Sequence, residues 1–427
     1  MILIKNGKVV NPGGKEGNLH LLIKDNKIVK MERDIREKGA RVIDANGKIV
    51  APGLIDLHAH LREPGREDEE TISQTCMAAA RGGFTSICCM ANTNPPIDNQ
   101  GTVKFIKDKA ILSGCAINIF PVGAISKGRK GEELAEIAEL KEAGVVGLSD
   151  DGNCVLNALL MRRAFEYTKM FDLPLISHCE DKNLSKNGVM NEGYFSTVLG
   201  LPGIPDEAEE VMVYRDISLA RMTEGKLHIT HTSTRGSVEL IRQAKRKKVK
   251  ISADVTPHHL ILTDEAVKSF DTNTKMNPPL RSREDIKALK DGLSDGTIDV
   301  IATDHAPHSR EEKEDDFKSA PFGIVGLETG LALILTEIVD KGIITLKSAI
   351  SKLSTNPAKI LGLNKGILKK GGDADIIIID PDIKWTITTD DFAGPCKNSP
   401  FIGREVKGRA IMTIVAGKIV FLHNPGF

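Results

Sequence analysis

Three side chains in the segment 53–65 have types and spacing that could perform chemistry: His58, His60 and Arg62. The segment begins with an apolar run, which predicts a β-strand. Side chains alternate between the two faces of a strand, so these three point the same way. Two imidazoles at a strand end can hold one metal ion, and a guanidinium one step further out could bind an anionic ligand beside it. Taken alone, the two histidines could also line the interior of a barrel as ordinary polar residues.

The elements that would position these side chains alternate between strand and helix. Apolar runs typical of strands buried on both faces occur at 54–60, 86–90, 117–122, 145–148, 175–178, 227–231, 249–254 and 299–302. Helical patterns separate them at 69–81, 131–143, 156–171, 207–221, 237–247 and 283–293. Eight strands alternating with helices predict an α/β fold, a parallel (β/α)8 TIM barrel. A doubly wound sheet is the alternative, but it would need a glycine-rich phosphate turn after its first strand, and the sequence has none there.

Short β-rich runs separated by turn residues occupy both ends of the chain. We expect residues 1–52, as a small antiparallel sheet, to combine with residues 367–427 in one β-sandwich satellite domain, because chain termini often lie close together. The barrel would then take residues 53–366. The charged run 310–318 has few apolar anchors, and we expect a mobile loop there and not a helix in the core.

The composition narrows the class of protein. Lys+Arg and Asp+Glu both total 58, so the zero net charge gives no electrostatic case for nucleic acid or an anionic membrane as a partner. No apolar run approaches the roughly 18 residues that span a bilayer, and the N-terminus lacks the apolar core of a signal peptide. Seven cysteines without paired spacings favour neither a disulfide framework nor a thiolate zinc site. We therefore expect a reduced, cytoplasmic protein.

Potential metal ligands concentrate at the C-terminal ends of the predicted barrel strands. Of the eleven histidines, only His20 and His423 fall outside the predicted barrel. The others lie on or after predicted strands: His58, His60, His178, His228, His231, His258, His259, His305 and His308. Asp150 and Asp151 follow the fourth strand, and Asp304 follows the eighth. Active sites of such barrels form at this face, so the sequence predicts one site built from several distant segments.

These segments resemble the motifs of class I dihydroorotases, which belong to the amidohydrolase superfamily, over essentially the whole chain. The resemblance is carried by residues 56–65, 90–95, 149–152, 177–181, 231–233, 256–259, 275–281, 303–308 and 372–375. His-Leu-Arg-Glu-Pro-Gly at 60–65 and Asn-Pro-Pro-Leu-Arg at 277–281 are specific together, whereas His-x-His alone indicates only an amidohydrolase. The resemblance implies reversible hydrolysis of the cyclic amide of (S)-dihydroorotate to N-carbamoyl-L-aspartate, a step of pyrimidine (UMP) biosynthesis.

The resemblance also implies two Zn²⁺ ions per subunit. Their ligands would be His58, His60 and Asp304 for the first ion, His178 and His231 for the second, and Asp151 as the bridge. Many relatives bridge with a carbamylated lysine, but no lysine lies between residues 144 and 152. Asp150 is an alternative ligand, and the segment 150–152 could also be a turn in which an Asp side chain bonds its own backbone.

Catalytic and substrate-binding roles follow from the same resemblance. Asp304 would be the catalytic residue, accepting a proton as the tetrahedral adduct forms and delivering it to the leaving nitrogen; its alternative is a purely structural ligand. The substrate would contact His60, Arg62, Asn92, Asn277, His308, Phe322 and Gly323. Arg62 would bind the substrate carboxylate by a two-point fork that lysine cannot reproduce. By itself, Asn277 before a proline could also be a turn former.

Several polar residues near these motifs have open roles. His259 could steady the oxyanion of the reaction, and Asp56 could fix histidine tautomers from below. Glu180 and Asp181 could orient neighbouring ligands or belong to a solvated loop. The remaining histidines of the barrel are expected to support the ligands or to pack: His228, His258 and His305.

Two other functions compete with a dihydroorotase. The first is another cyclic amidohydrolase, a hydantoinase or an allantoinase. Arg62, and an aspartate instead of a lysine at the bridge position, argue against it. The second is a non-catalytic scaffold for aspartate transcarbamoylase, but such a chain would be expected to lack metal ligands. As partners, the small-molecule substrate is expected first, and the resemblance adds a homodimer and an association with aspartate transcarbamoylase.

Overall fold

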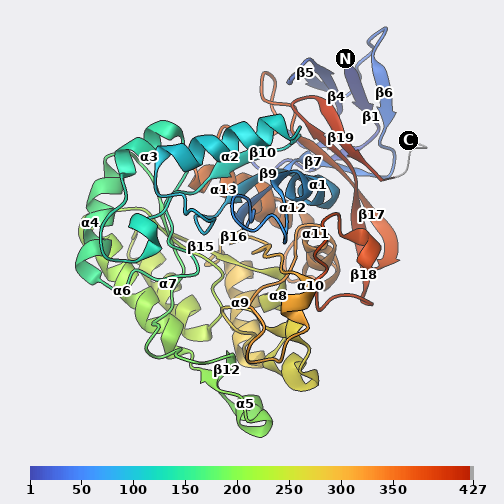
Figure 1. Ribbon diagram of the computed structural model, residues 1–427. Coiled ribbons are helices and arrows are strands. Elements are labelled where there is room, and N and C mark those ends of the chain that lie inside the picture. The colour runs from blue at the N-terminus through green and yellow to red at the C-terminus, as the bar shows by residue number, and fades with distance from the viewer. Residues whose placement is uncertain (424–427) are drawn as a thin grey trace.

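Parallel strands alternate with helices through the middle of the chain, as the computed structural model of the protein shows for residues 1–423 (Figure 1). One sheet has the strand order β10-β9-β8 and another the order β11-β14-β15-β16. Every strand pair in these two sheets is parallel. The strands are β8 (Leu54–Ala59), β9 (Phe84–Cys89), β10 (Asn118–Pro121), β11 (Leu175–Ser177), β14 (Leu227–Ile229), β15 (Ile251–Val255) and β16 (Val300–Ile301).

Backbone pairing links these two sheets at both of their ends. Leu148 forms parallel bridges to Gly123 and to Leu175, so the segment 145–148 joins β10 to β11. At the other end Ala59 pairs in parallel with His305, and the His60 amide donates to the His305 carbonyl at 2.8 Å. Pairing therefore runs from β8 through 145–148 to β16 and returns to β8, over the eight segments that the sequence predicts as strands.

Helices follow most of these strands. They are α1 (Ile72–Gly82), α2 (Gln100–Leu112), α3 (Ile137–Ala143), α4 (Ala158–Lys169), α6 (Glu207–Thr223), α7 (Arg235–Arg246) and α9 (Arg283–Asp295). Two predictions need correction. The predicted helix 131–143 starts only at Ile137. The helix α2 was not among those named from the sequence; its apolar residues do not all lie on one face, because Phe105, Ile111 and Leu112 are exposed.

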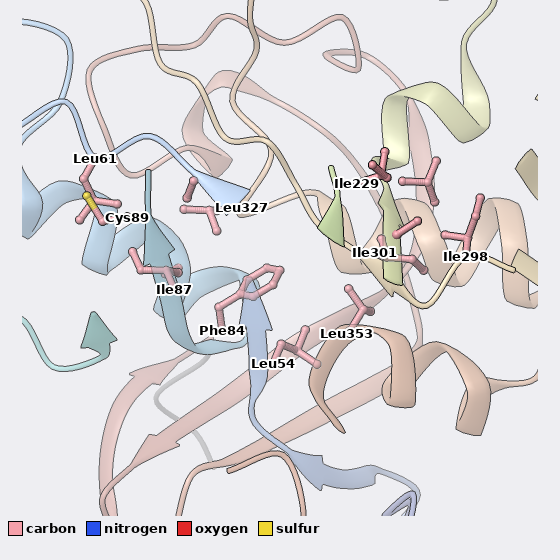
Figure 2. Packing of buried hydrophobic residues seen from close by; sticks show 14 of the residues in the cluster. Leu54, Leu61, Phe84, Ile87, Cys89, Ile229, Ile298, Ile301, Leu327 and Leu353 are labelled. Carbon is pink, nitrogen blue, oxygen red and sulfur yellow. The ribbon is translucent and has the colours of Figure 1, made fainter. Parts of the chain in front are cut away.

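The first helix illustrates how local sequence sets the start of an element. Thr71 and Gln74 form a capping box that satisfies free amides at the start of α1. Gly83 ends the helix with φ 89°, a conformation that glycine adopts without a steric penalty, and the chain then enters β9 at Phe84. Phe84 is fully buried and pairs with Leu54 of β8; Figure 2 shows both beside Leu353 in the main core.

Strands from both ends of the chain lie together at one side of the molecule (Figure 1). Six of them form a sheet in the order β19-β18-β17-β7-β2-β3, and four form a sheet in the order β5-β4-β1-β6. The N-terminal strands are β1 (Ile2–Lys5), β2 (Lys8–Val9), β3 (Gly17–Asn18), β4 (His20–Lys24), β5 (Lys27–Glu32), β6 (Arg41–Asp44) and β7 (Ile49–Pro52). The C-terminal strands are β17 (Ile376–Thr386), β18 (Glu405–Val415) and β19 (Lys418–Leu422).

The pairing of these terminal strands differs from the predicted antiparallel sheet. β1 pairs with β6 in parallel, and β2 pairs with β7 in parallel. The sheets are therefore mixed, and the N-terminal strands are divided between them. β7 also pairs with β17, so residues near position 50 and residues near position 378 share one sheet. Asparagine-glycine turns indicate where strands end but not which strands become neighbours.

Smaller elements surround the strand ends. They are β12 (Met190–Asn191), β13 (Gly203–Ile204), α5 (Tyr194–Leu199), α8 (Pro257–Ile261), α10 (Arg310–Lys313), α11 (Gly330–Ile334), α12 (Leu346–Ile350) and α13 (Asn356–Ile360). The segment 310–318, predicted to be a loop and not a core helix, begins with the single helical turn α10, in which only Lys313 is buried. Lys313 supplies the anchor: its side chain is buried and donates to the Pro321 and Gly323 carbonyls at 2.9 and 3.2 Å.

Two of the seven cysteines are joined. A disulfide connects Cys76 on α1 with Cys115 after α2, across Cα atoms 5.6 Å apart. The prediction that all cysteines are reduced is therefore wrong for this pair, because helices distant in sequence bring the two together. None of the helices in the described part of the chain is long and apolar enough to cross a membrane.

Candidate metal centre and active site

Six side chains that the sequence spreads over 247 positions lie together at the C-terminal ends of the parallel strands. His58 ends β8 and His60 follows it; His178 and His231 lie just beyond β11 and β14; Asp304 lies beyond β16 and Asp151 beyond the segment 145–148. All six are buried. Two groups of three among them, His58–His60–Asp151 and Asp151–His178–His231, bring their potential ligand atoms within 4.8 Å of one another.

The Asp151 carboxylate lies between two pairs of imidazoles. Its Oδ2 is 3.2 Å from His58 Nε2 and 3.6 Å from His60 Nε2. Its Oδ1 is 3.3 Å from His231 Nε2 and 3.5 Å from His178 Nδ1. Each oxygen thus faces a different histidine pair, which is the geometry of a carboxylate that could bridge two cations.

Asp304 completes one side of this cluster. Its Oδ1 lies 3.1 Å from His60 Nε2 and 3.4 Å from His58 Nε2. It also lines the cavity described below, so one carboxylate oxygen faces the histidines while the residue remains accessible to a ligand.

The pKa values in the cluster reflect competition between burial and opposite charge. Burial alone would lower the pKa of His58, but the Asp151 and Asp304 carboxylates raise it to about 10. Burial likewise opposes the charged form of His178, whereas Asp151 and Glu180 raise its pKa to about 9. Burial would raise the pKa of Asp151, yet the surrounding imidazoles lower it well below its usual value. Two buried carboxylates thus attract positive charge to this position.

The nitrogen atoms on the far sides of the rings have their own partners. His58 Nδ1 contacts Thr230 Oγ1 at 2.6 Å, His60 Nδ1 contacts Asn92 Oδ1 at 2.8 Å, and His178 Nε2 contacts Glu180 Oε2 at 2.8 Å. These contacts orient the rings so that the nitrogens facing Asp151 are free to bind a cation. His231 Nδ1 is buried and has no hydrogen-bond partner among the described residues. This set of imidazoles and carboxylates is the donor set that zinc prefers.

Three residues of the site have backbone conformations that are strained for non-glycine residues. Arg62, His231 and Asp304 have φ of 60°, 34° and 52°. Such conformations cost about 1–3 kcal/mol each and persist where surrounding contacts hold them. The His231 amide donates to Asp254 Oδ1 at 2.6 Å, and the Asp304 amide donates to the His58 carbonyl at 3.1 Å.

Asp254 is a supporting residue that the sequence analysis missed. It is fully buried, contacts His228 Nε2 at 2.8 Å and accepts from Thr230 Oγ1 at 3.0 Å. Thr230 in turn contacts His58, so Asp254 supports both His58 and the backbone of His231. His228 therefore contacts Asp254 and supports His58 and His231 only indirectly, through that carboxylate. The only sequence signal is that Asp254 is an aspartate at the end of an apolar strand.

Asp150 and Asp56 face away from the histidine rings. Asp150 accepts from the amides of Ile125 and Ser126 at 2.8 and 3.1 Å and from the Ser126 hydroxyl, so it holds a neighbouring loop. Asp56 accepts from the Thr303 amide at 3.0 Å and from the His58 amide at 3.2 Å. The expectation that Asp56 fixes histidine tautomers is therefore wrong: it positions the backbone next to Asp304.

The other histidines divide between support and packing. Both ring nitrogens of His259 are occupied, by Thr256 Oγ1 at 2.8 Å and by the Pro278 carbonyl at 2.9 Å, which argues against the expected contact with an oxyanion. His305 Nε2 contacts Glu70 at 2.9 Å and links the end of β16 to the start of α1. His258 is buried beside His259.

A cavity of about 860 Å³ opens over the cluster. Its walls include every substrate-binding residue proposed from the sequence: His60, Arg62, Asn92, Asn277, His308, Phe322 and Gly323. Asn277 Nδ2 donates to Glu180 Oε2 at 2.9 Å, which connects this wall to His178. Glu180 is thus part of the site, whereas Asp181 caps a turn by accepting from the Asn183 amide.

Arg62 is held in the cavity wall by Glu69, which the sequence analysis missed. Arg62 Nε lies 2.9 Å from Glu69 Oε2 and donates to the Pro307 carbonyl at 2.9 Å. Glu69 Oε1 also contacts His308 Nδ1 at 2.8 Å. Burial and the Arg62 charge lower the pKa of His308 to about 3, so this imidazole is neutral at pH 7. One buried carboxylate thus fixes a cation and a neutral imidazole side by side.

Comparison with known proteins defines the class first. The fold matches an L-hydantoinase (dihydropyrimidinase) from Arthrobacter aurescens with a TM-score of 0.88 and 27% identity, over 99% of this chain and 96% of that chain. It also matches a D-hydantoinase (dihydropyrimidinase) from Thermus sp. with a TM-score of 0.85. A buried cluster of imidazoles and carboxylates on this fold defines a cyclic amidohydrolase.

The sequence relatives are more specific. A family model described as dihydro-orotase-like matches residues 47–237. A dihydroorotase of Pelotomaculum thermopropionicum is 55% identical over 98% of both chains, and one of Caldanaerobacter subterraneus is 51% identical over 100% of this chain and 98% of the other. The chain therefore belongs to the dihydroorotase family.

Gly323 offers a test of the cavity wall. Its φ of 128° is strained for any residue with a side chain, and an added Cβ would lie 2.7 Å from Ala306 Cβ. We expect Gly323→Ala to lower the free energy of unfolding by about 1–3 kcal/mol, measured by urea denaturation. Gly152→Ala is the matched control, because Gly152 lines the same cavity and nothing lies within 4 Å of its added Cβ. Equal losses in both variants would contradict the assignment of strain to position 323.

Proposed function

We propose that this protein is a zinc-dependent class I dihydroorotase of the amidohydrolase superfamily, which interconverts (S)-dihydroorotate and N-carbamoyl-L-aspartate in pyrimidine biosynthesis. The observation that carries the proposal is the Asp151 carboxylate, whose two oxygens face two different histidine pairs. Arg62 and Asp304 line the same cavity, so a cation for a substrate carboxylate and a carboxylate for proton transfer adjoin that cluster.

The proposed metal ligands are the six clustered side chains. One Zn²⁺ would be held by His58, His60 and Asp304, the other by His178 and His231, and Asp151 would bridge them. When bound, such a pair lowers the pKa of a shared water and polarises the amide carbonyl of the ring. The far-side contacts to Thr230, Asn92 and Glu180 keep the rings in the orientation that this binding needs.

Asp304 is the proposed proton carrier. Its Oδ1 contacts His60 and His58, and the residue lies in the wall of the cavity that Arg62 and His308 also line. The attacking water loses its proton to Asp304 as the new C–O bond forms. Asp304 then gives that proton to the ring nitrogen as the C–N bond breaks. The new carboxylic acid of the open-chain product loses its proton to solvent, which leaves the dicarboxylate. The reverse sequence closes the ring.

The cavity walls supply substrate recognition. Arg62 and Asn92 would bind the substrate carboxylate, and the Arg62 fork suits its two oxygens. Asn277, His308 and the backbone of Phe322–Gly323 would contact the ring. His60 would serve both a metal ion and the bound substrate.

The remaining predictions from the sequence stay proposals of architecture and partners. We assign the eight parallel segments to a closed (β/α)8 barrel of residues 53–366 and the terminal strands, 1–52 and 367–427, to one β-sandwich satellite domain; residues 424–427 of that range lie outside the described residues. A cytoplasmic location, a homodimer and an association with aspartate transcarbamoylase stay predictions from the family resemblance.

Zinc quantification alongside an assay of dihydroorotate hydrolysis tests the proposed function. We expect about two Zn²⁺ per chain and hydrolysis that a chelator abolishes and added zinc restores. Hydantoin and allantoin, tested in parallel, separate the rival amidohydrolases. A protein that binds zinc but opens hydantoin or allantoin far faster than dihydroorotate would not be a dihydroorotase.

Replacing Asp304 with Asn tests the proton-transfer role. We expect kcat to fall by about 10²–10⁴-fold, because the amide cannot accept the proton, while zinc at the His178–His231 position remains. Asp172→Asn is the control, since Asp172 lies on the surface with its side chain 83% exposed. Near-normal turnover by the Asp304 variant would remove that residue from the mechanism.

Replacing Arg62 with Met tests carboxylate recognition. Loss of a charge-assisted hydrogen bond of about 1.5–3 kcal/mol should raise KM for dihydroorotate by about 10–10²-fold, and far less for an uncharged cyclic imide. Arg162→Met, on the exposed face of α4, serves as control. If KM rises equally for both substrates, Arg62 supports the cavity wall but does not bind the substrate carboxylate.

A further inference from the structure

The cavity extends well beyond the metal cluster. Its volume of about 860 Å³ far exceeds a six-membered ring that carries one carboxylate. The carboxylates in its walls all belong to the cluster or touch it: Asp151, Glu180 and Asp304. Its cations are more numerous, and four of them have no role in the proposed chemistry: Lys182, Lys186, Lys275 and Lys318. The outer part of the cavity is therefore positively charged.

Lys275 is the most unusual of these cations because it is buried without a counterion. Only 2% of the residue is exposed, and no carboxylate lies within ion-pair distance of its ammonium among the described residues. Its Nζ donates to the Lys318 carbonyl at 2.8 Å and lies 4.7 Å from the centre of the Phe322 ring. An ammonium has three donors, so this wall holds a buried charge whose hydrogen-bonding capacity is only partly used.

Lys186 and Lys318 place further free charge at the mouth of the cavity. Both are exposed, and in the described part of the chain neither side chain forms an ion pair. Lys186 precedes β12, whereas Lys318 follows α10, so they come from different segments of the wall. Lys182 differs, because it already pairs with Glu180. The nearby Asp316 carboxylate accepts from the Ser319 hydroxyl and from the amides of its own turn.

We infer that Lys186, Lys275 and Lys318 form a cationic outer wall that favours the dianionic, open-chain dicarboxylate over the monoanionic ring acid. The identity of these two ligands rests on the proposed function. The physical reason is that Coulomb energy scales with ligand charge, so a given positive potential doubles its effect on a dianion. The wall would concentrate the substrate of ring closure at the mouth, before Arg62 and the metal ions engage it.

Equilibrium binding of non-reacting probes is the appropriate readout. A catalyst cannot change the ratio of kcat/KM in the two directions of one reaction, so turnover would hide a preference for either ligand. N-acetyl-L-aspartate is a dianion that lacks the amino nitrogen needed for ring closure. Orotate presents a similar ring with one carboxylate. Both can be titrated calorimetrically into the zinc-loaded protein at low ionic strength.

The test compares wild type with the double variant Lys186→Ala/Lys318→Ala. A unit charge about 10 Å from a ligand changes affinity about twofold per unit of ligand charge in water. We therefore expect the double variant to bind orotate about fourfold more weakly and N-acetyl-L-aspartate about sixteenfold more weakly. At about 1 M salt, where the Debye length is about 3 Å, the difference between the two probes should disappear.

The matched control is Lys8→Ala/Lys24→Ala, which removes the same charge from exposed residues of the terminal sheets. Lys275→Met removes the buried charge, and it too should weaken binding of the dianionic probe more than binding of the monoanionic probe. Equal weakening of both probes, no weakening, or the same loss in the control variant would overturn the inference. The two hypotheses can fail separately. If the double variant loses affinity for the two probes by the expected factors but the wild-type protein does not hydrolyse dihydroorotate, the proposed function is wrong and the inference about the cationic wall is retained.

Discussion

The site depends on one constraint: a buried carboxylate, Asp151, must lie between four imidazoles and share its two oxygens between them. Two buried carboxylates are costly to desolvate, and only nearby positive charge stabilises them. The raised pKa values of His58 and His178 show how the protein itself supplies part of that charge. The same arrangement brings together imidazole and carboxylate groups that could hold metal ions.

Much of the surrounding structure keeps this cluster in place. Asp254, fully buried, supports His58 through Thr230 and holds the strained backbone at His231. Glu180 orients His178 and Asn277 together. Glu69 performs a similar task on the opposite wall, where it fixes Arg62 and His308. Glu180 thus connects a proposed metal ligand with a residue proposed to face the substrate, whereas Asp254 and Glu69 each fix residues within one part of the site.

The charge pattern divides the cavity into two regions. The carboxylates in its walls belong to the buried histidine–aspartate cluster or contact it, whereas the lysines Lys186 and Lys318 in its walls are exposed. Lys275 and Lys313, both buried, also tie the segment that carries Phe322 and Gly323 to the body of the protein. The outer wall and the substrate-binding backbone are thereby part of one structure.

The sequence by itself indicated the alternating strands and helices and the concentration of histidines and aspartates at one end of the strands, because strand periodicity fixes which face a side chain takes and parallel strand ends share one edge. The choice of the six clustered side chains and of the cavity residues came from the resemblance to class I dihydroorotases. The sequence did not determine the partners that orient these side chains. The roles of Glu69 and Asp254 could not be assigned from local sequence, since Glu69 contacts His308 and Asp254 contacts His228 and the His231 amide only in the folded chain. The Cys76–Cys115 bond, the buried Lys313 and the parallel pairing of β1 with β6 likewise arise only when distant segments pack. Local sequence patterns specify which face of a strand a side chain takes and where a strand ends. Tertiary packing decides which segments become neighbours.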